Sequence, residues 1–230
     1  MIRTLALFLS ILSAVTVANG SSISAVTTRA SLNANSTVVW SDFGPDGTDV
    51  VSGSTIAASD GLIVTVSQPF YGLQIRQQGT DWYGDFAVGD ALLTNWNSPF
   101  SVTLTFSQPI YGAGLQIEPG QVQDLPAPFT AYVTAFDGST SLGTFSVTGT
   151  KSNAGDDSAP FLGVLSDSPD VRSMTYRVVV QTNGPYTGDL GMNFMSIQSA
   201  SPVPEPSSLL MLGIGAFAGI GTIRKWRLLA

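Results

Sequence analysis

The chain has 230 residues, a formal net charge of −7 and only 11% charged residues. It contains no histidine and no cysteine, which excludes Ser-His-Asp and Cys-His catalysis, conventional zinc sites and disulfide bonds. Between Ser21 and Ser201 five basic side chains are outnumbered by 15 acidic ones, a net charge of −10. Such a segment repels nucleic acids and anionic membrane surfaces, so no nucleic-acid partner is expected.

Residues 1–20 are predicted to be a signal peptide. Arg3 gives a positive start, residues 5–17 are apolar but short for a membrane span, and residues 18–20 offer small side chains to signal peptidase. We expect cleavage after Gly20, with Ala18 as the alternative. Residues 21–201 then form one domain, long enough to bury a sizeable core. Because cysteine is absent, this domain depends on core packing even in an oxidising compartment.

The domain is predicted to be all-β, an antiparallel β-sandwich or jelly roll. Apolar and polar residues alternate most clearly at Val102, Leu104 and Phe106, and Asp137-Gly138-Ser139 predicts a hairpin turn. Many short strands, frequent turn signals and the lack of helical periodicity favour this class. A long loop is expected at residues 77–97. The predicted strands span residues 38–40, 62–66, 102–106, 115–117, 129–135, 142–147, 161–165, 174–180 and 192–197.

Two similar stretches follow two of these strands. Residues 67–72 read S-Q-P-F-Y-G and residues 107–112 read S-Q-P-I-Y-G, each followed by L-Q-I, directly or after two inserted residues. We predict that both are corners between strands, where proline interrupts the ladder and glycine supplies a permissive backbone dihedral. A duplicated half-domain is the alternative.

No catalytic residue is predicted, and the protein is expected not to be an enzyme. A glycosidase needs only two carboxylates, and the nominees are Asp81 with Asp85 and Asp156 with Asp157. These residues lie among glycine and asparagine, where aspartate is more often a turn residue. The only glutamate of the domain is Glu118, at a predicted strand end.

No cofactor and no metal site is predicted, with a structural calcium ion as the alternative. Calcium prefers oxygen ligands from Asp, Asn and loop carbonyls. Neither acidic cluster fits an EF-hand, because the twelfth position counted from Asp42 is Gly53 and not Glu. The two clusters are Asp42, Asp46 and Asp49, and Asn153, Asp156 and Asp157.

Trp82, Tyr83 and Trp96 are predicted to form a glycan-stacking surface. They lie beside Asp and Asn in a loop, where a ring face can stack on a sugar while polar side chains bond its hydroxyls. The alternative is that these rings pack in the core.

The C-terminal 29 residues combine three features. Two prolines keep the first segment extended and accessible. Residues 207–223 are uncharged, slightly fewer than the roughly 20 residues of an untilted transmembrane helix, and the positive-inside bias keeps the basic end in the cytoplasm. The motif residues are Val203, Pro204, Glu205 and Pro206, and the stop-transfer cluster is Arg224, Lys225 and Arg227 within residues 224–230.

This order of motif, apolar span and basic cluster at residues 202–230 resembles the PEP-CTERM sorting signal of exported proteins in Gram-negative bacteria that make exopolysaccharide. The resemblance implies an exosortase-type processing enzyme and an inner-membrane-anchored intermediate that later reaches the cell surface or extracellular matrix. Residues 113–199, with F-T-A-Y-V-T-A-F-D-G and D-L-G-M-N-F, resemble the exported β-sandwich domain often found ahead of such tails.

These features together predict an exported matrix or envelope protein, sorted to the cell surface, whose domain is structural or binds polysaccharide, including exopolysaccharide. The alternative function is glycan cleavage by paired aspartates.

Overall fold

The computed structural model describes residues 21–69, 72–95, 100–120, 122, 125–181 and 186–200. Strands account for 58% of the structure and there is almost no helix, which confirms the all-β prediction. The predicted signal peptide 1–20 and sorting tail 202–230, with its helix 207–223, lie outside the described residues. Among the residues that are described, no helix is long and apolar enough to cross a bilayer.

The described residues form one connected antiparallel sheet of 15 strands. Two 3-10 helices accompany it, η1 (Ala30–Leu32) and η2 (Trp40–Phe43). The strands are β1 (Ile23–Val26), β2 (Ser36–Val38), β3 (Asp49–Val50), β4 (Ser54–Ala57), β5 (Ile63–Ser67), β6 (Leu73–Gln77), β7 (Ala91–Thr94), β8 (Val102–Pro119), β9 (Ala127–Asp137), β10 (Thr140–Lys151), β11 (Phe161–Ser166), β12 (Val171–Val180), β13 (Tyr186–Gly188), β14 (Leu190–Met192) and β15 (Met195–Ser199).

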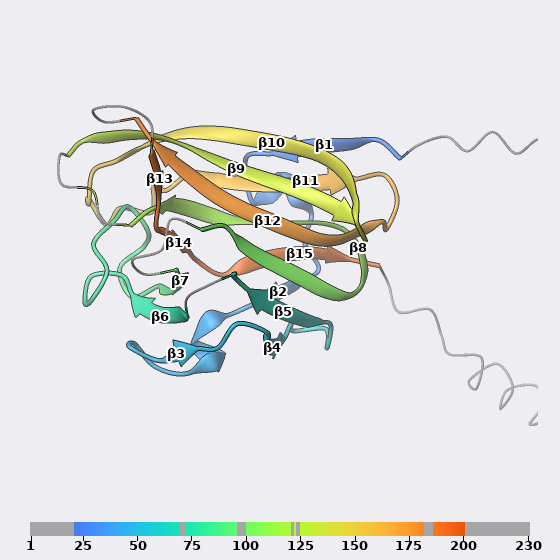
Figure 1. Ribbon diagram of the computed structural model, residues 1–230, viewed down its shortest axis with the longest axis horizontal. Helices are drawn as coiled ribbons and strands as arrows, with labels where there is room; N and C mark the ends of the chain where they lie inside the picture. Colours follow the sequence, from blue (N-terminus) through green and yellow to red (C-terminus); the bar gives the residue numbers. More distant parts are fainter. Residues whose placement is uncertain are drawn as a thin grey trace, which may run out of the picture.

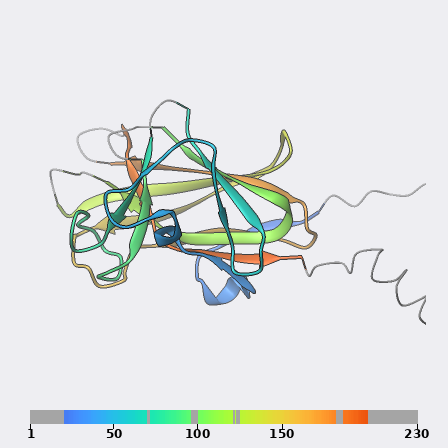
Figure 2. The ribbon, with the colours of Figure 1, turned by 90° about the horizontal axis from the view of Figure 1, so that it is seen from below.

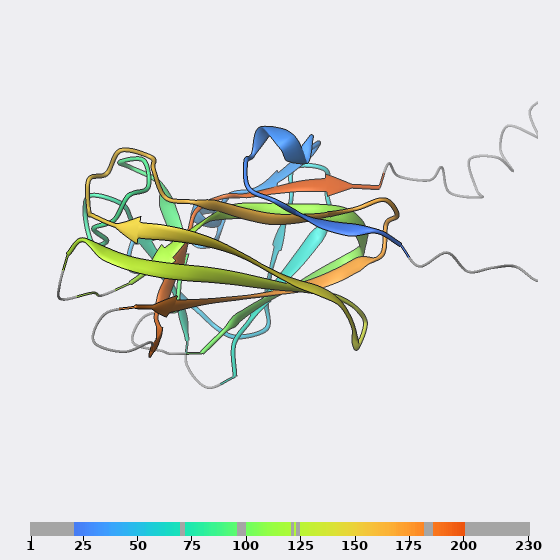
Figure 3. The same ribbon diagram turned by 90° about the horizontal axis from the view of Figure 1, so that it is seen from above.

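The 18-residue strand β8 joins three groups of strands. Its first residues pair with β5 and β12, its middle with β11 and β15, and its last residues with β14. The sheet therefore bends along β8. Figure 1 shows β9, β10 and β12 along one side and the chain from β3 to β6 along the other. The view from below has the segment β3 to β6 in front (Figure 2), and the view from above has β9 and β10 in front (Figure 3).

The core is built by alternating side chains, as the period-two pattern predicts. Val102 and Leu104 of β8 are buried, and so is one face of β12, including Tyr176. Thr103 of β8 and Thr175 of β12 lie on the other face of their strands, and their hydroxyls share a hydrogen bond at 2.9 Å. Trp40 is completely buried in the core, and its Nε1 donates a hydrogen bond to the carbonyl of Asn193 at 2.7 Å.

The two similar stretches adopt different structures. The first is a corner, because β5 ends at Ser67 and β6 begins at Leu73. The corner predicted at residues 107–112 is wrong, since these residues continue β8. Pro109 is tolerated because the β8 and β12 pairing shifts register between Thr105 and Ile110, so no regular ladder bond is required there. The different structures give no support to a duplicated half-domain.

Further differences concern short elements. The predicted long loop at residues 77–97 contains strand β7, and the predicted strand at residues 192–197 is divided between β14 and β15. Residues 102–106, 129–135, 142–147, 161–165 and 174–180 lie in strands as predicted. The strand predicted at residues 62–66 corresponds to β5, whereas residues 38–40 run from the end of β2 to the start of η2. The short strands β1, β3, β4 and β7 were not predicted.

Candidate functional site

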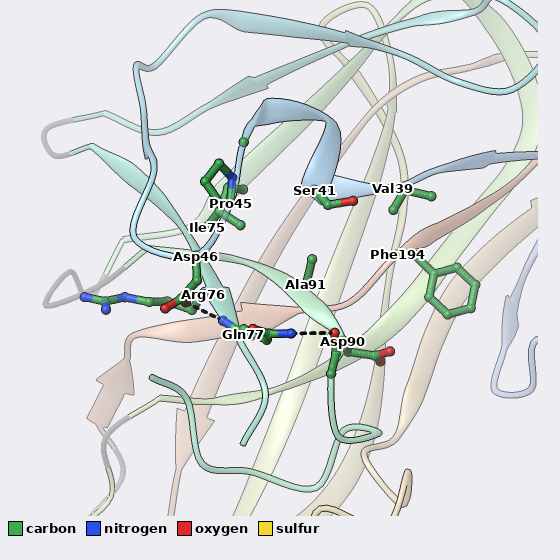
Figure 4. Close-up of a pocket in the computed structure, with 12 residues that line it drawn as sticks. Val39, Ser41, Pro45, Asp46, Ile75, Arg76, Gln77, Asp90, Ala91 and Phe194 are labelled. Carbon is green, nitrogen blue, oxygen red and sulfur yellow. Dashed lines mark hydrogen bonds between the residues drawn. The ribbon is translucent and has the colours of Figure 1, made fainter. Parts of the chain in front are cut away.

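A pocket of about 450 Å³ opens between η2, the end of β6 and the start of β7 (Figure 4). Its volume lies in the range of small-molecule sites. Apolar side chains and a few polar groups share its lining, which is the usual composition of such sites. The polar and aromatic residues of this lining are Ser41, Asp46, Arg76, Gln77, Asp90 and Phe194.

Asp46 is held at the pocket by a clamped turn. Its Oδ1 accepts a hydrogen bond from the backbone N–H of Gln77 at 2.7 Å. The backbone of Gly47 donates to the carbonyl of Ile75 at 2.8 Å, and the N–H of Ile75 donates to the carbonyl of Thr48 at 2.8 Å. The turn is therefore fastened to β6 on both sides, and the half-buried carboxylate has a fixed position.

Asp90 is oriented by the side-chain amide of Asn193, which is fully buried. The Nδ2 of Asn193 donates to Asp90 Oδ2 at 3.2 Å and also to Oε1 of Gln116, while its Oδ1 accepts from the backbone of Gln116 at 3.0 Å. Burial raises the pKa of Asp90; the hydrogen bond from Asn193 and the charge of Arg29 oppose this, and the charge of Asp157 adds to it. Asp90 is thus a partly desolvated carboxylate at the pocket wall.

Phe194 contributes an aromatic ring backed by a cation. The guanidinium of Arg29 lies 3.7 Å from the centre of this ring, and its Nη1 donates to the carbonyl of Phe194 at 3.2 Å and to Oγ of Ser196 at 2.6 Å. Burial lowers the pKa of Arg29, while the charges of Asp157 and Asp90 oppose that shift. One face of the ring is occupied by Arg29, and the residue also lines the pocket.

The predicted stacking role of Trp82 does not fit the structure, whereas the core alternative does. Trp82 is 3% exposed and its Nε1 donates to Glu118 Oε1 at 3.0 Å. Gly191 packs so closely on the ring that a Cβ there would lie 2.7 Å from it. Tyr83 is 63% exposed, and its stacking role stays a prediction. Trp96 lies outside the described residues.

The first nominated carboxylate pair is directed to different partners. Asp81 Oδ2 forms an ion pair with Arg76 Nη1 at 2.8 Å near the surface. Asp85 is 2% exposed, and its carboxylate accepts hydrogen bonds from Ser152 and from the backbone of Ala154. Asp85 therefore anchors the chain after β10, and its carboxylate oxygens are already engaged by protein donors.

The second nominated pair also serves the loop that contains it. Asp157 Oδ1 accepts from Gln116 Nε2 at 2.9 Å. A hydrogen bond from Ser158 lowers the pKa of the exposed Asp156. Across the described part of the chain, no three carboxylates are close enough to hold a metal ion. The structural calcium ion remains an untested prediction.

Sequence reasoning missed Phe194, Asp90, Asn193 and Arg29. Asn193 and Phe194 belong to the stretch D-L-G-M-N-F at residues 189–194. Nothing in the sequence connected this stretch to a turn near residue 46 or to a loop near residue 90. The pocket exists only because β6, β7 and the segment between β14 and β15 are neighbours in space.

The fold and the pocket define an all-β protein with a partly polar surface site. The model of the PEP-CTERM protein-sorting motif matches residues 202–225. The chain therefore carries this motif, which marks an exported protein sorted to the cell surface through an exosortase-type enzyme. The matched residues include Val203, Pro204, Glu205, Pro206, Arg224 and Lys225 but not Arg227. No curated protein matches the chain.

Proposed function

We propose that this protein is a non-enzymatic component of the cell envelope or extracellular matrix, and that its domain binds a polysaccharide in the pocket beside β6 and β7. The observation that carries this proposal is the pocket wall itself. Two carboxylates, Asp46 and Asp90, and one aromatic side chain, Phe194, line the same cavity. Carboxylates accept hydrogen bonds from sugar hydroxyls, and an aromatic ring packs on apolar sugar C–H groups.

The rigidity of the wall supports recognition. Asp46 is fixed by the backbone of Gln77, and Asp90 by the buried Asn193. Because these contacts hold the carboxylates before any ligand arrives, binding costs little side-chain ordering.

Charge favours a neutral ligand. Residues 21–201 carry a net charge of −10, and the charged residues that line the pocket are two carboxylates, Asp46 and Asp90, and one cation, Arg76. The acidic surface would repel a polyanionic glycan, and the pocket has one more carboxylate than cation. We therefore propose neutral exopolysaccharide as the partner.

Affinity electrophoresis tests this proposal, with the neutral fraction of matrix polysaccharide cast in the gel and polygalacturonate as the anionic comparison. Wild-type protein is expected to be retarded by the neutral fraction only. Phe194→Ala should lose about tenfold in affinity, corresponding to about 1.4 kcal/mol. Tyr132→Ala is the matched aromatic control outside the pocket, since its ring on β9 packs on Arg177, and its retardation should equal that of wild type. Equal retardation of all three proteins would refute binding at this pocket.

Glycan cleavage by paired aspartates is the second candidate function. Asp46 and Asp90 are the carboxylates that share the pocket, whereas Asp81 and Asp85 bond elsewhere. Incubation with the neutral polysaccharide should release no reducing ends. Release that disappears in Asp90→Asn would replace binding by hydrolysis as the function.

The remaining steps of sorting complete the proposal. Signal peptidase removes residues 1–20, residues 207–223 hold the chain in the inner membrane as a helix, and the basic residues Arg224, Lys225 and Arg227 keep its end in the cytoplasm. We further propose that the strands on the two sides of the core form the two layers of a β-sandwich. Deleting residues 224–227 should reduce retention and processing, and unchanged processing would contradict the stop-transfer role.

A further inference from the structure

A buried ion pair lies apart from the proposed pocket, where β8 and β10 end. Lys151 Nζ is 3.1 Å from Glu118 Oε1, and the two residues are 3% and 0% exposed. Nζ also donates to the carbonyl of Pro119 at 3.1 Å. Two opposite charges are thus held together away from water, an arrangement whose desolvation costs several kcal/mol per ion.

Both oxygens of Glu118 receive further donors. Trp82 Nε1 donates to Oε1 at 3.0 Å, and the backbone N–H of Asp85 donates to Oε2 at 3.0 Å. Gly84 packs directly on the group, since a Cβ there would lie 1.5 Å from Oε1. Such fixed donors stabilise negative charge that develops on a carboxyl oxygen when a nucleophile attacks its carbon.

We propose that Lys151 and Glu118 condense to an isopeptide bond that covalently joins β10 to β8. The Nζ–Cδ bond forms and one Cδ–O bond of Glu118 breaks. Two protons of the ammonium group leave with that oxygen as one water molecule. The ion pair becomes a neutral amide, so atoms and charge balance without an oxidant or any other reactant.

Burial and proximity favour the condensation. In bulk water the separate ions are well hydrated, but inside the protein that hydration is absent, so a neutral amide is favoured relative to the ion pair. Fixed geometry adds a large effective concentration of the amine at the carboxyl group. Burial also raises the pKa of Glu118, although Lys151 and the Trp82 hydrogen bond oppose the rise, and a protonated carboxyl is the form that an amine attacks.

The bond would connect strands that are not neighbours in the sheet. The strand order β10-β9-β12-β8 places two strands between them. The cross-link therefore closes a covalent loop from Glu118 to Lys151 around the β9–β10 hairpin. In an exported chain without cysteine, such a bond takes the stabilising role that disulfides have in other exported domains.

Trypsin digestion of the denatured full chain, followed by mass spectrometry, tests the bond. Arg76, Lys151 and Arg172 are consecutive cleavage sites, and trypsin does not cut after an acylated lysine. The linked protein should yield one peptide covering residues 77–172, lighter than its sequence by one water. Separate peptides 77–151 and 152–172 with unaltered masses would overturn the proposal.

Lys151→Arg is the matched variant, because it keeps the positive charge but cannot form this bond. It should restore the full mass and cleavage after residue 151. Loss of water at the Asp137-Gly138 sequence inside this peptide would leave cleavage after Lys151 intact in wild type, and that result would also overturn the cross-link. Glu118→Ala provides a second variant without the acceptor, and its peptides should likewise separate with full mass.

Discussion

The domain contains two polar clusters with different access to solvent. The Glu118 cluster is fully buried, and its carboxylate is surrounded by protein donors from Lys151, Trp82 and Asp85. The second cluster is Asp90, the buried Asn193 that holds it, and Phe194; Asp90 and Phe194 are half-buried and line the pocket. The first can act only on the protein itself, through stability or a bond within the chain. The second leaves a carboxylate and a ring available to a ligand.

The largest expected effect comes from removing one partner of the buried pair. Glu118→Ala leaves Lys151 buried without its counter-ion, so the free energy of unfolding should fall by about 3–5 kcal/mol. Denaturant unfolding followed by tryptophan fluorescence measures this change. The matched control is Arg172→Ala, which breaks the exposed 2.9 Å pair with Asp137 and should cost less than about 1 kcal/mol. Similar losses in the two variants would remove the distinction between buried and exposed pairs.

The next effect concerns the tight packing against Glu118. Gly84→Ala places a methyl group where Oε1 already lies, so the carboxylate must move and the domain should lose about 1–3 kcal/mol of stability. Gly72→Ala has open space around its Cβ and should change stability by less than about 0.5 kcal/mol. The unfolding midpoints of the two variants compare them directly. A neutral Gly84→Ala would show that the cluster tolerates displacement.

The pocket should respond to pH because of Asp90. Burial raises the pKa of this carboxyl above its ordinary value of 3.8. Its negative form is therefore lost as pH falls through that raised pKa, and neutral-polysaccharide affinity should fall in the same window. Affinity electrophoresis at stepped pH gives the midpoint. Asp90→Asn should bind more weakly at neutral pH and lack this transition; an identical pH profile would assign the effect to another group.

For protein stability the same shift has the opposite sign. A carboxyl whose pKa is raised on folding binds protons more tightly in the folded state, so Asp90 contributes a penalty above that pKa which disappears on acidification. Ligand binding and stability should therefore change in opposite directions over this window.

The smallest effect is expected at the rim. Asp81 is half exposed and forms a surface ion pair with Arg76. Asp81→Asn removes this pair and should lower the free energy of unfolding by less than about 1 kcal/mol. Because Arg76 also lines the pocket, polysaccharide affinity in this variant shows whether the rim pair matters for binding. Unchanged affinity is expected.

The long strands could be predicted because alternation reports directly which side of a strand is buried. Residues 102–106 and 174–180 illustrate this. The structure of the second S-Q-P stretch could not be predicted. Its proline and glycine favour a turn, but the pairing of β8 with β11 and β15 keeps it in a strand. Gly112 and Gly114 permit that pairing, since a Cβ at either position would collide with β11.

Neither polar cluster could be predicted, because each depends on contacts between distant parts of the chain. Glu118 meets Lys151 across 33 residues, and Asn193 meets Asp90 across 103. The sequence signals that were found, aromatic residues near 82 and paired aspartates, instead marked residues that hold the loops together.

The two ends of the described chain leave the domain on the same side. The start of β1 and the end of β15 lie at one end, whereas β6 and β7 lie at the other (Figure 1). Strand β15 ends at Ser199 and the sorting motif begins at residue 202, so the connection spans only about 10 Å even when extended. The pocket beside β6 and β7 and the point where the sorting tail joins the domain therefore lie at opposite ends of the domain.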